Sequence, residues 1–323
     1  MRSERAVLTL AAGKPIYWQM AINLARSFLC WHKQSDIRFC VVTDLPSALP
    51  KDLSGVEVVR LSPDKLGEGF SAKLHLDELA PAAKTLFIDA DCLVVANLET
   101  VFDQFSGRAV SVVGSSIERG EWFGNVGTLC ARFNVSALPK FNGGVYYIEK
   151  GAAAQAVYER ARELERDYDN LGLKRLRNRP NDELLVAIAM ATHGLNAVPD
   201  DGSFLSSPFE CPGPFSIDVL RGHATLINPP APSVRHNDWY PFTEVHPVLV
   251  HFLGDFHRSY QYRCEAARLA HWARPALVRL LIRVVTVLLI SLPGFSKEWI
   301  KDMLRPVYHQ LFHPRRPAPS PRI

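Results

Sequence analysis

Short apolar runs with strand character alternate with stretches of helical periodicity along most of the chain. The strand-like runs cover residues 7–11, 37–43, 56–61, 85–88, 109–113, 144–148 and 248–252. The helix-like stretches cover residues 16–31, 72–79, 152–166 and 184–192. This alternation predicts an α/β fold in which a mixed, mainly parallel sheet is flanked by helices. Ligands of such sheets bind beyond the carboxyl ends of the strands, so residues at those ends are candidates for function.

The chain of 323 residues is long enough for one large domain and an appendage. We expect the domain to cover residues 1–263, a basic amphipathic helical extension to cover 264–312, and a disordered tail to cover 313–323. Residues 199–241 are rich in Pro, Gly and Ser, which predicts loops. In the extension, Pro275 can start a helix, and Pro293 with Gly294 can end it.

Charge divides the chain unevenly. The segment from Arg258 onward holds 12 Lys and Arg against 3 Asp and Glu, whereas the first 257 residues hold 25 basic and 30 acidic residues. A nucleic-acid binder is not expected, because the basic residues are confined to a tail with hydrophobic interleaving. The basic segment suits an anionic membrane surface, and the alternative is a solvated tail without function.

Residues 276–292 read ALVRLLIRVVTVLLISL, and their polar residues Arg279, Arg283 and Thr286 fall on one helical face. A spanning helix needs about 20 mainly apolar residues, and this stretch is shorter and carries two arginines. We therefore expect a helix in the membrane interface with its polar face outward. The alternative is an ordinary helix packed on the domain. The six cysteines form no CxxC pair, which indicates a reducing compartment without a disulfide framework. The protein is thus expected in the cytoplasm, peripheral on the inner face of the membrane.

The sharpest chemical signal is a pair of carboxylates, Asp89 and Asp91, at the end of the apolar run Phe87-Ile88. Hard divalent cations such as Mg²⁺ and Mn²⁺ take carboxylate oxygens and also bind phosphate oxygens. An Asp-x-Asp sequence is common by chance, and a cap or turn at a strand end is the alternative interpretation. Its position after a core strand favours a site, because unpaired buried carboxylates are costly.

Two further motifs follow along the chain. Phe141-Asn142-Gly143-Gly144-Val145 places paired glycines before a strand, where they allow close backbone approach by a ligand or simply form a tight turn. His251 lies in an apolar run that ends near Gly254. Such a histidine is more often a core residue, but a neutral imidazole can complete an oxygen-rich metal site.

Taken in this order, the three motifs, together with Lys73 in Phe70-Ser71-Ala72-Lys73-Leu74, resemble the GT-A fold nucleotide-sugar glycosyltransferases. Within that group the chain resembles glycosyltransferase family eight, which includes retaining galactosyl- and glucosyltransferases and the glycogenins. The resemblance covers residues 6–258 and leaves the tail outside. It implies a catalytic domain that transfers a hexose from a UDP-sugar to an acceptor hydroxyl, with retention of the anomeric configuration. The acceptor would be a glycan or lipid-linked acceptor, as in cell-surface glycan or lipopolysaccharide synthesis.

The resemblance also implies roles for individual residues. Asp89, Asp91 and His251 would ligate Mn²⁺ or Mg²⁺, which would bridge the diphosphate. The residues that would contact the donor are Ala11, Asp44, Lys73, Asp89, Asn142, Gly143, Gly144 and Gly254. Asn181, Asp182 and Glu183 match the catalytic segment that faces the sugar and the acceptor. The departing phosphate oxygen would deprotonate the acceptor, which accounts for the lack of an obvious catalytic base.

The chain departs from the family pattern at two places. No Lys follows Gly254, so His257 or Arg258 would have to contact the phosphate instead. The usual Asp-Gln before the late helix is replaced by Asn181-Asp182-Glu183.

Two other functions stay open at the level of sequence. A nucleotidyltransferase would also need two carboxylates and a metal on an α/β sheet, but Ala11-Ala12-Gly13-Lys14 only faintly matches a triphosphate loop. An inactive membrane-associated interaction protein would suit the basic extension, although the intact acidic motif favours an enzyme.

Overall fold

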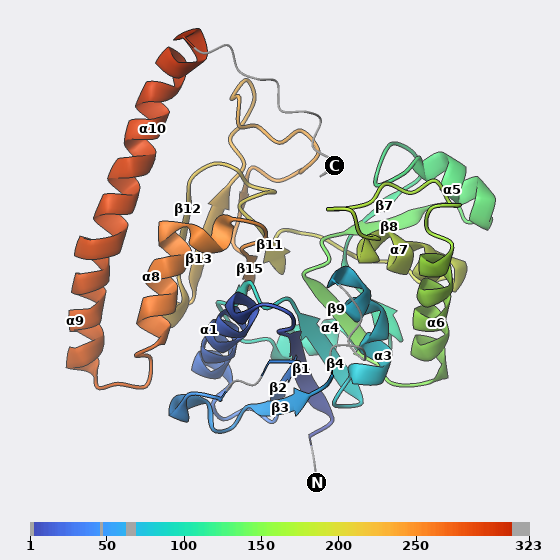
Figure 1. The fold of residues 1–323 in the computed structure, drawn as a ribbon, viewed down its shortest axis with the longest axis horizontal. Coiled ribbons are helices and arrows are strands. Elements are labelled where there is room, and N and C mark those ends of the chain that lie inside the picture. Colours follow the sequence, from blue (N-terminus) through green and yellow to red (C-terminus); the bar gives the residue numbers. More distant parts are fainter. Residues whose placement is uncertain (1–2, 46–47, 63–68, 312–323) are drawn as a thin grey trace.

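The computed structural model describes residues 3–45, 48–62 and 69–311, and the predicted disordered tail lies outside this range. Its centre is a sheet of six strands in the order β3-β2-β1-β4-β9-β6. β3, β2, β1 and β4 run parallel, and β9 pairs antiparallel with both β4 and β6. The predicted mixed, mainly parallel α/β sheet is confirmed (Figure 1). The strands of this sheet are β1 (Arg5–Leu10), β2 (Arg38–Thr43), β3 (Glu57–Arg60), β4 (Lys84–Ile88), β6 (Val110–Ser111) and β9 (Val145–Glu149).

Hydrophobic side chains cover both faces of the sheet, because successive residues of a strand point to opposite sides. In β4, Leu86 and Ile88 pack on one face and Phe87 packs on the other, all fully buried. One face lies against α1 and α8, and the other against α6 and α7 (Figure 1). The helices are α1 (Pro15–His32), α3 (Leu76–Leu79), α4 (Glu99–Phe105), α5 (Val126–Phe133), α6 (Ala152–Arg166), α7 (Asp182–Thr192), α8 (Tyr260–Leu269), α9 (Ala276–Thr286) and α10 (Leu292–Leu311).

Three small sheets surround the central one. Their strand orders are β10-β7-β8, β11-β15-β5 and β12-β13-β14. The segment 199–241, predicted as loops, contains whole strands of two of these sheets, and that prediction was wrong in this respect. The strands are β5 (Cys92–Val94), β7 (Val113–Ile117), β8 (Leu138–Phe141), β10 (Val198–Pro199), β11 (Leu205–Ser206), β12 (Phe215–Asp218), β13 (His223–Ile227), β14 (Glu244–Val245) and β15 (Leu249–His251).

Two other local predictions need correction. The stretch predicted as one helix over 72–79 begins as a 3₁₀ helix, Gly69–His75, and only its end is α-helical. The run 109–113 does not form one strand, because Val112 separates β6 from β7, which join different sheets. Helix α6 has the predicted bounds.

The C-terminal helix does not end at Pro293. A π-helical turn, Val287–Ser291, connects α9 to α10, and the helical backbone continues to Leu311. Pro293 is the second residue of α10. Proline has no backbone N–H to donate, and the wider π-helical turn before it changes the hydrogen-bond pattern so that the helix can continue. The result is the long rod at the edge of the molecule in Figure 1.

Helix α8, which spans the predicted boundary after Arg263, packs in the main core through Tyr262 and Leu269. Helix α9 then lies on α8 with its polar side inward. Thr286 is buried, its Oγ1 lies 3.4 Å from Arg268 Nε, and the Arg283 guanidinium lies 3.5 Å from Asp218. The polar face therefore lies on the domain and the apolar face is exposed, so the helix packs on the domain along one side only.

Candidate active site

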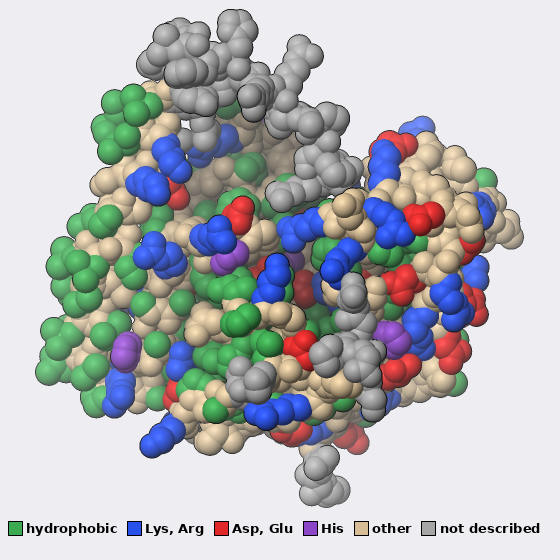
Figure 2. Space-filling view, viewed as in Figure 1, with side chains coloured by type: hydrophobic (Ala, Val, Ile, Leu, Met, Phe, Trp, Pro, Cys, Tyr) green, Lys and Arg blue, Asp and Glu red, His purple; other side chains and the backbone are tan. Residues whose placement is uncertain are grey.

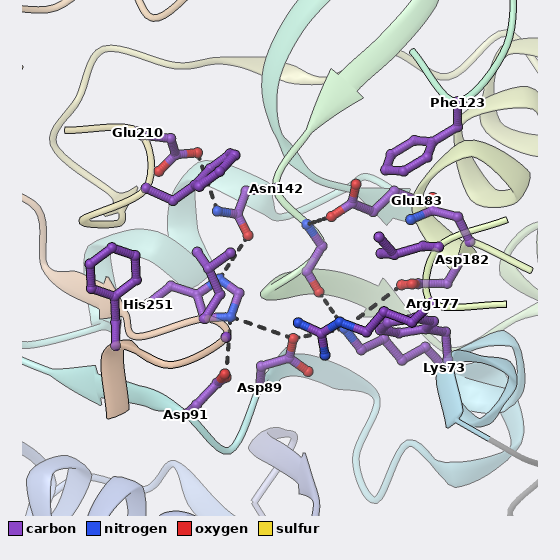
Figure 3. A pocket seen from close by; sticks show the side chains of 18 of the residues that line it. Lys73, Asp89, Asp91, Phe123, Asn142, Arg177, Asp182, Glu183, Glu210 and His251 are labelled. Atoms are coloured by element: carbon purple, nitrogen blue, oxygen red, sulfur yellow. Dashed lines mark hydrogen bonds and ion pairs between the residues drawn. The ribbon is translucent and has the colours of Figure 1, made fainter. Parts of the chain in front are cut away.

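The two carboxylates of the Asp-x-Asp motif lie at the carboxyl end of β4, in a turn closed by a bond from Cys92 N to Asp89 O. Strand β15 is antiparallel to β5 and sets His251 opposite Cys92. Through this pairing, His251 Nε2 lies 3.1 Å from Asp91 Oδ1 and 3.8 Å from Asp89 Oδ2. The sheet therefore brings together all three residues that the resemblance implied as metal ligands (Figure 3).

The environment sets His251 in one orientation. Asn142 Oδ1 accepts a hydrogen bond from Gly144 N at 3.0 Å and lies 2.8 Å from His251 Nδ1. The Asn142 amide nitrogen donates to Glu210 at 3.2 Å. Because Asn142 Oδ1 is an acceptor, Nδ1 of His251 must donate, and its Nε2 faces the two carboxylates. This is the orientation that a metal-ligating histidine requires.

Charge coupling between these groups is strong. Burial tends to lower the pKa of His251, but the Asp91 and Asp89 carboxylates outweigh it and raise that pKa. Burial opposes ionisation of Asp91, yet the facing His251 holds the pKa of Asp91 below its usual value. For Asp89, burial prevails over the nearby Lys73, and its pKa is raised. A cation placed among these side chains would compete with the proton on Nε2 of His251.

Lys73 projects from the 3₁₀ helix into the same cluster. Its ammonium donates to Asp89 at 2.7 Å and to the Gly143 carbonyl at 2.8 Å, and it lies 3.8 Å from Asp182. Burial would lower the pKa of Lys73, but the Asp182 and Asp89 carboxylates raise it, so the side chain stays charged. Lys73 thus connects Asp89, which follows β4, with Asp182 at the start of α7.

The paired glycines permit two close contacts with side chains of the protein itself. A Cβ on Gly143 would lie 2.7 Å from Cγ of Glu183, and a Cβ on Gly144 would lie 2.5 Å from Nδ1 of His251. The Gly143 N–H donates to Glu183 Oε1 at 2.7 Å. The glycines were predicted either to allow a ligand to approach or to form a tight turn, and in the structure they form a turn that Glu183 and His251 approach closely.

The predicted catalytic segment begins α7. Asn181 caps the helix by accepting a hydrogen bond from Leu184 N at 3.0 Å, so its side-chain oxygen has a structural partner. Asp182 accepts from Tyr146 Oη at 2.6 Å and is 3% exposed. Burial, with the Asp182 carboxylate beside it, raises the pKa of Glu183 to about 7. The Glu183 carboxyl can therefore gain or lose its proton near neutral pH.

A cavity of about 710 Å³ opens over this cluster. Lys73, Asp89, Asp91, Asn142, Gly143, Asn181, Asp182, Glu183, His251 and Gly254 all line it. Ala11 and Asp44 do not line it. Ala11 is fully buried and directly follows β1. Asp44 directly follows β2, and its carboxylate accepts a hydrogen bond from Gly13 N at 2.9 Å. Both residues therefore lie at the ends of the neighbouring strands β1 and β2, outside the cavity.

Several cavity residues were not found from the sequence. Arg177, Lys140, Phe209, Glu210 and Trp239 also line the cavity, and Phe209 and Trp239 are 36% and 41% exposed. They come from loops and from β8, where no strand or helix periodicity marks a functional face. The exposed aromatic pair offers an apolar surface next to the polar cluster.

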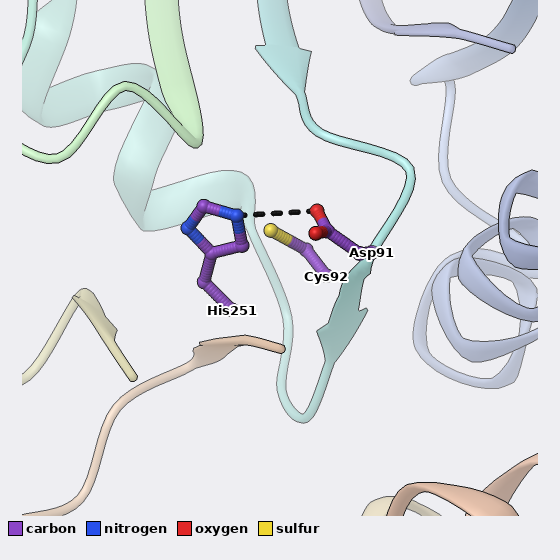
Figure 4. Close-up of side chains that lie close together, drawn as sticks. All are labelled: Asp91, Cys92 and His251. Atoms are coloured by element: carbon purple, nitrogen blue, oxygen red, sulfur yellow. Dashed lines mark ion pairs between the residues drawn. The ribbon is translucent and has the colours of Figure 1, made fainter. Parts of the chain in front are cut away.

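Cys92 was also missed as a neighbour of the metal candidates. Its Sγ lies within 4.8 Å of ligand atoms of Asp91 and His251 (Figure 4). Burial, with Asp91 and Asp89 nearby, raises the pKa of Cys92 well above its usual value, so the thiol stays protonated. A protonated thiol is a poor ligand, and the oxygen and nitrogen atoms are better suited to a hard cation.

The chain was compared with known proteins by sequence and by structure. Neither a protein-family model nor a curated protein sequence matches it. The structure of the galactosyltransferase LgtC, in complex with donor and acceptor sugar analogues, matches 77% of this chain and 87% of its own, with 17% identity and a TM-score of 0.52. An active-site mutant of LgtC gives 18% identity and a TM-score of 0.51 over the same shares. The chain has a GT-A glycosyltransferase fold. The bifunctional glycosyltransferase WbbM matches 79% of this chain and 46% of its own, with 13% identity and a TM-score of 0.50.

Proposed function

We propose that this protein is a metal-dependent glycosyltransferase that transfers a hexose from a UDP-sugar to an acceptor hydroxyl. The observation that carries the proposal is the convergence of Asp89, Asp91 and His251 on one wall of the cavity, at the carboxyl end of a core strand. The GT-A fold supports it, because solved structures with this fold include sugar transferases.

The residues present fit a hard divalent cation such as Mn²⁺ or Mg²⁺. Asp89 and Asp91 supply carboxylate oxygens, and Asn142 turns Nε2 of His251 toward them. When bound, the cation would neutralise charge on the diphosphate of the donor. Lys73 would keep Asp89 in place through its 2.7 Å contact, and the exposed aromatic pair would provide a surface for the acceptor.

We propose that the anomeric configuration is retained. The bond between the anomeric carbon and the β-phosphate oxygen would break with its electron pair remaining on that oxygen. The acceptor oxygen would form the new bond on the same face, and its proton would pass to the departing phosphate. Glu183, with a pKa of about 7 and its carboxylate on the cavity wall, would stabilise positive charge at the sugar carbon. Asp182 would position Lys73, and Asn181 would fix the helix start.

The first experiment is UDP-sugar hydrolysis across a panel of donors, with Mn²⁺ and with chelator, in the wild type and in Asp91→Ala. The proposal expects turnover of one donor that needs the metal and is lost in the variant. Asp103→Ala is the matched control, because Asp103 is exposed on α4 and does not line the cavity. Turnover that is equal with chelator would refute metal dependence. Failure of the wild type to turn over or bind any UDP-sugar would refute the function.

We further propose that the protein works at the cytoplasmic face of a membrane on a glycan or lipid-linked acceptor. The described part of the chain contains a helix, Ala276–Lys301, that is long and apolar enough to cross a membrane by length and composition alone. Its polar side is bonded to the domain, whereas Leu277 and Leu289 on the outer side are 70% and 71% exposed. Hydrophobic side chains line this edge in Figure 2. A helix with this arrangement suits the interface better than the membrane interior.

Sedimentation with anionic vesicles tests this membrane proposal. Leu288→Glu, on the outer side of the helix, should reduce the bound fraction severalfold. Val234→Glu is the matched control, because Val234 is 95% exposed on a different segment. Equal binding by both variants, or no binding by the wild type, would contradict a membrane role for the helix.

A further inference from the structure

Four described Lys and Arg side chains line the cavity, and three of them already have a partner there. Lys73 is bonded to Asp89, Arg258 lies 3.8 Å from Asp255, and Lys140 lies over the ring of Trp239 at 5.1 Å. Within the described residues, Arg177 makes no hydrogen bond or ion pair. It is therefore the cavity cation whose charge is left for a ligand.

The position of Arg177 results from a tight hairpin. Leu176 and Arg179 exchange both backbone hydrogen bonds, at 2.9 and 3.0 Å, around the two residues Arg177 and Asn178. These two central residues have φ values of 52° and 64°. Positive φ at both positions is the pattern of a type I′ turn, which usually takes Asn or Gly. An arginine is unfavourable in this backbone conformation. Its presence at the tip indicates that the side chain serves a purpose there.

Two hydrogen bonds at Lys174 anchor the chain just before the hairpin, so the arginine is presented on a supported loop. Lys174 N donates to Phe123 O at 2.7 Å, and Tyr168 Oη donates to Lys174 O at 2.8 Å. The Arg177 guanidinium reaches the loop that follows β15, since its Nη2 would lie 3.9 Å from a Cβ on Gly254. Figure 3 draws Arg177 among the side chains that line the cavity, together with Lys73 and Asp89.

The two residues expected to contact the phosphate are engaged elsewhere. His257 Nδ1 lies 2.6 Å from the Gly254 carbonyl, and Arg258 lies beside Asp255 with 77% of its side chain exposed. Neither points a free cation at the cluster of Asp89 and Asp91. Arg177 lines the same cavity and lies beside Gly254 without an ion-pair partner among the described residues.

We propose that Arg177 binds the β-phosphate of the nucleotide donor and stabilises the leaving nucleoside diphosphate. The inference rests on the proposed function. A guanidinium presents N–H donors in a planar fork that matches two phosphate oxygens. The leaving group gains a negative charge when the anomeric C–O bond breaks and its electron pair remains on the phosphate oxygen. A fixed cation at that oxygen therefore favours departure.

The test is calorimetric titration of the full chain with UDP and with UMP, each in the presence of Mn²⁺. Arg177→Ala should weaken UDP binding by about tenfold or more, since a charge-assisted contact is lost. UMP binding should change little, because UMP has no β-phosphate. Arg175→Ala is the matched control: it removes the same charge from the same hairpin, but Arg175 is paired with Asp169 at 2.8 Å.

Two further variants separate the guanidinium from the fold. Arg177→Gly suits the positive φ, so its melting temperature should equal or exceed that of the wild type while UDP binding is still weakened. Arg177→Lys should recover part of the affinity. Unchanged UDP affinity in Arg177→Ala and Arg177→Gly would overturn the inference, as would an equal loss in Arg175→Ala. If the wild type binds no UDP with Mn²⁺, the proposed function itself fails. If the wild type and the Arg177 variants all bind UDP equally well, only the role of Arg177 fails.

Discussion

Replacing Gly144 by alanine should disrupt the candidate metal site without changing any of its ligands. The new Cβ would lie 2.5 Å from Nδ1, 2.8 Å from Cε1 and 3.1 Å from Cγ of His251. Non-bonded carbon contacts are normally about 3.5–4.0 Å, so the imidazole ring has to retreat by roughly 1 Å. Gly144 does not have a positive φ, and alanine can therefore adopt its backbone conformation.

The retreat would break the contacts that orient the histidine. Nδ1 of His251 lies 2.8 Å from Asn142 Oδ1. A retreat of roughly 1 Å would lengthen this distance beyond the range of a hydrogen bond. Displacing a ligand from its orienting partner typically costs roughly 10- to 100-fold in metal affinity. Overpacking of a buried site should also lower the free energy of unfolding by about 1–3 kcal/mol.

The assay combines Mn²⁺ titration by calorimetry with urea unfolding. Gly55→Ala is the matched control, because a Cβ there meets nothing within 4 Å. In a His251→Ala background, Gly144→Ala should cost little stability, since the ring it would strike is gone. Wild-type Mn²⁺ affinity in Gly144→Ala, or the same stability loss in both backgrounds, would refute the reasoning.

Three further changes test the surrounding contacts. Lys73→Met should lower the unfolding free energy by about 3–5 kcal/mol in urea titrations, because Asp89 and Asp182 lose their cation; a loss below about 1 kcal/mol would contradict this. Burial raises the pKa of Glu265 from 4.5 to about 7, so the folded state holds this proton more tightly than the unfolded state does. The stability that results is fully present below the unfolded pKa of about 4.5 and is lost as pH rises to about 7. The loss amounts to roughly 3 kcal/mol at most. Urea titrations should therefore show Glu265→Gln gaining stability relative to the wild type between pH 5 and pH 8, and parallel pH profiles would be the adverse result. Asn142→Ala should weaken Mn²⁺ binding about 10- to 100-fold in calorimetry, whereas unchanged affinity would mean that His251 needs no orienting partner.

Much of the site could be predicted because its residues follow local patterns. Asp89 and Asp91 come directly after an apolar run, and the carboxyl ends of parallel strands are where ligands bind. Asn181 precedes a helical stretch and is its cap. These features depend on neighbours within a few residues, so the sequence expresses them directly.

The partners of these residues could not be predicted in the same way. His251 meets Asp91 only because β15 pairs with β5, which lies far earlier in the chain, as their register shows. Arg177 belongs to a two-residue turn whose sequence lacks the usual glycine, so no local signal marked it. The strands β12 and β13 were missed because they lie in a segment rich in turn-forming residues.

Local sequence is enough to specify the alternation of strands and helices, the acidic end of β4 and the amphipathic character of the C-terminal helix. Each follows from periodicity or from adjacent residues, which act before any distant contact forms. Long-range packing was needed to bring Glu183 and His251 against Gly143 and Gly144, and to turn the polar side of α9 toward Asp218. Those outcomes depend on which buried charges find partners across the fold, because an unpaired buried charge is too costly to leave in place.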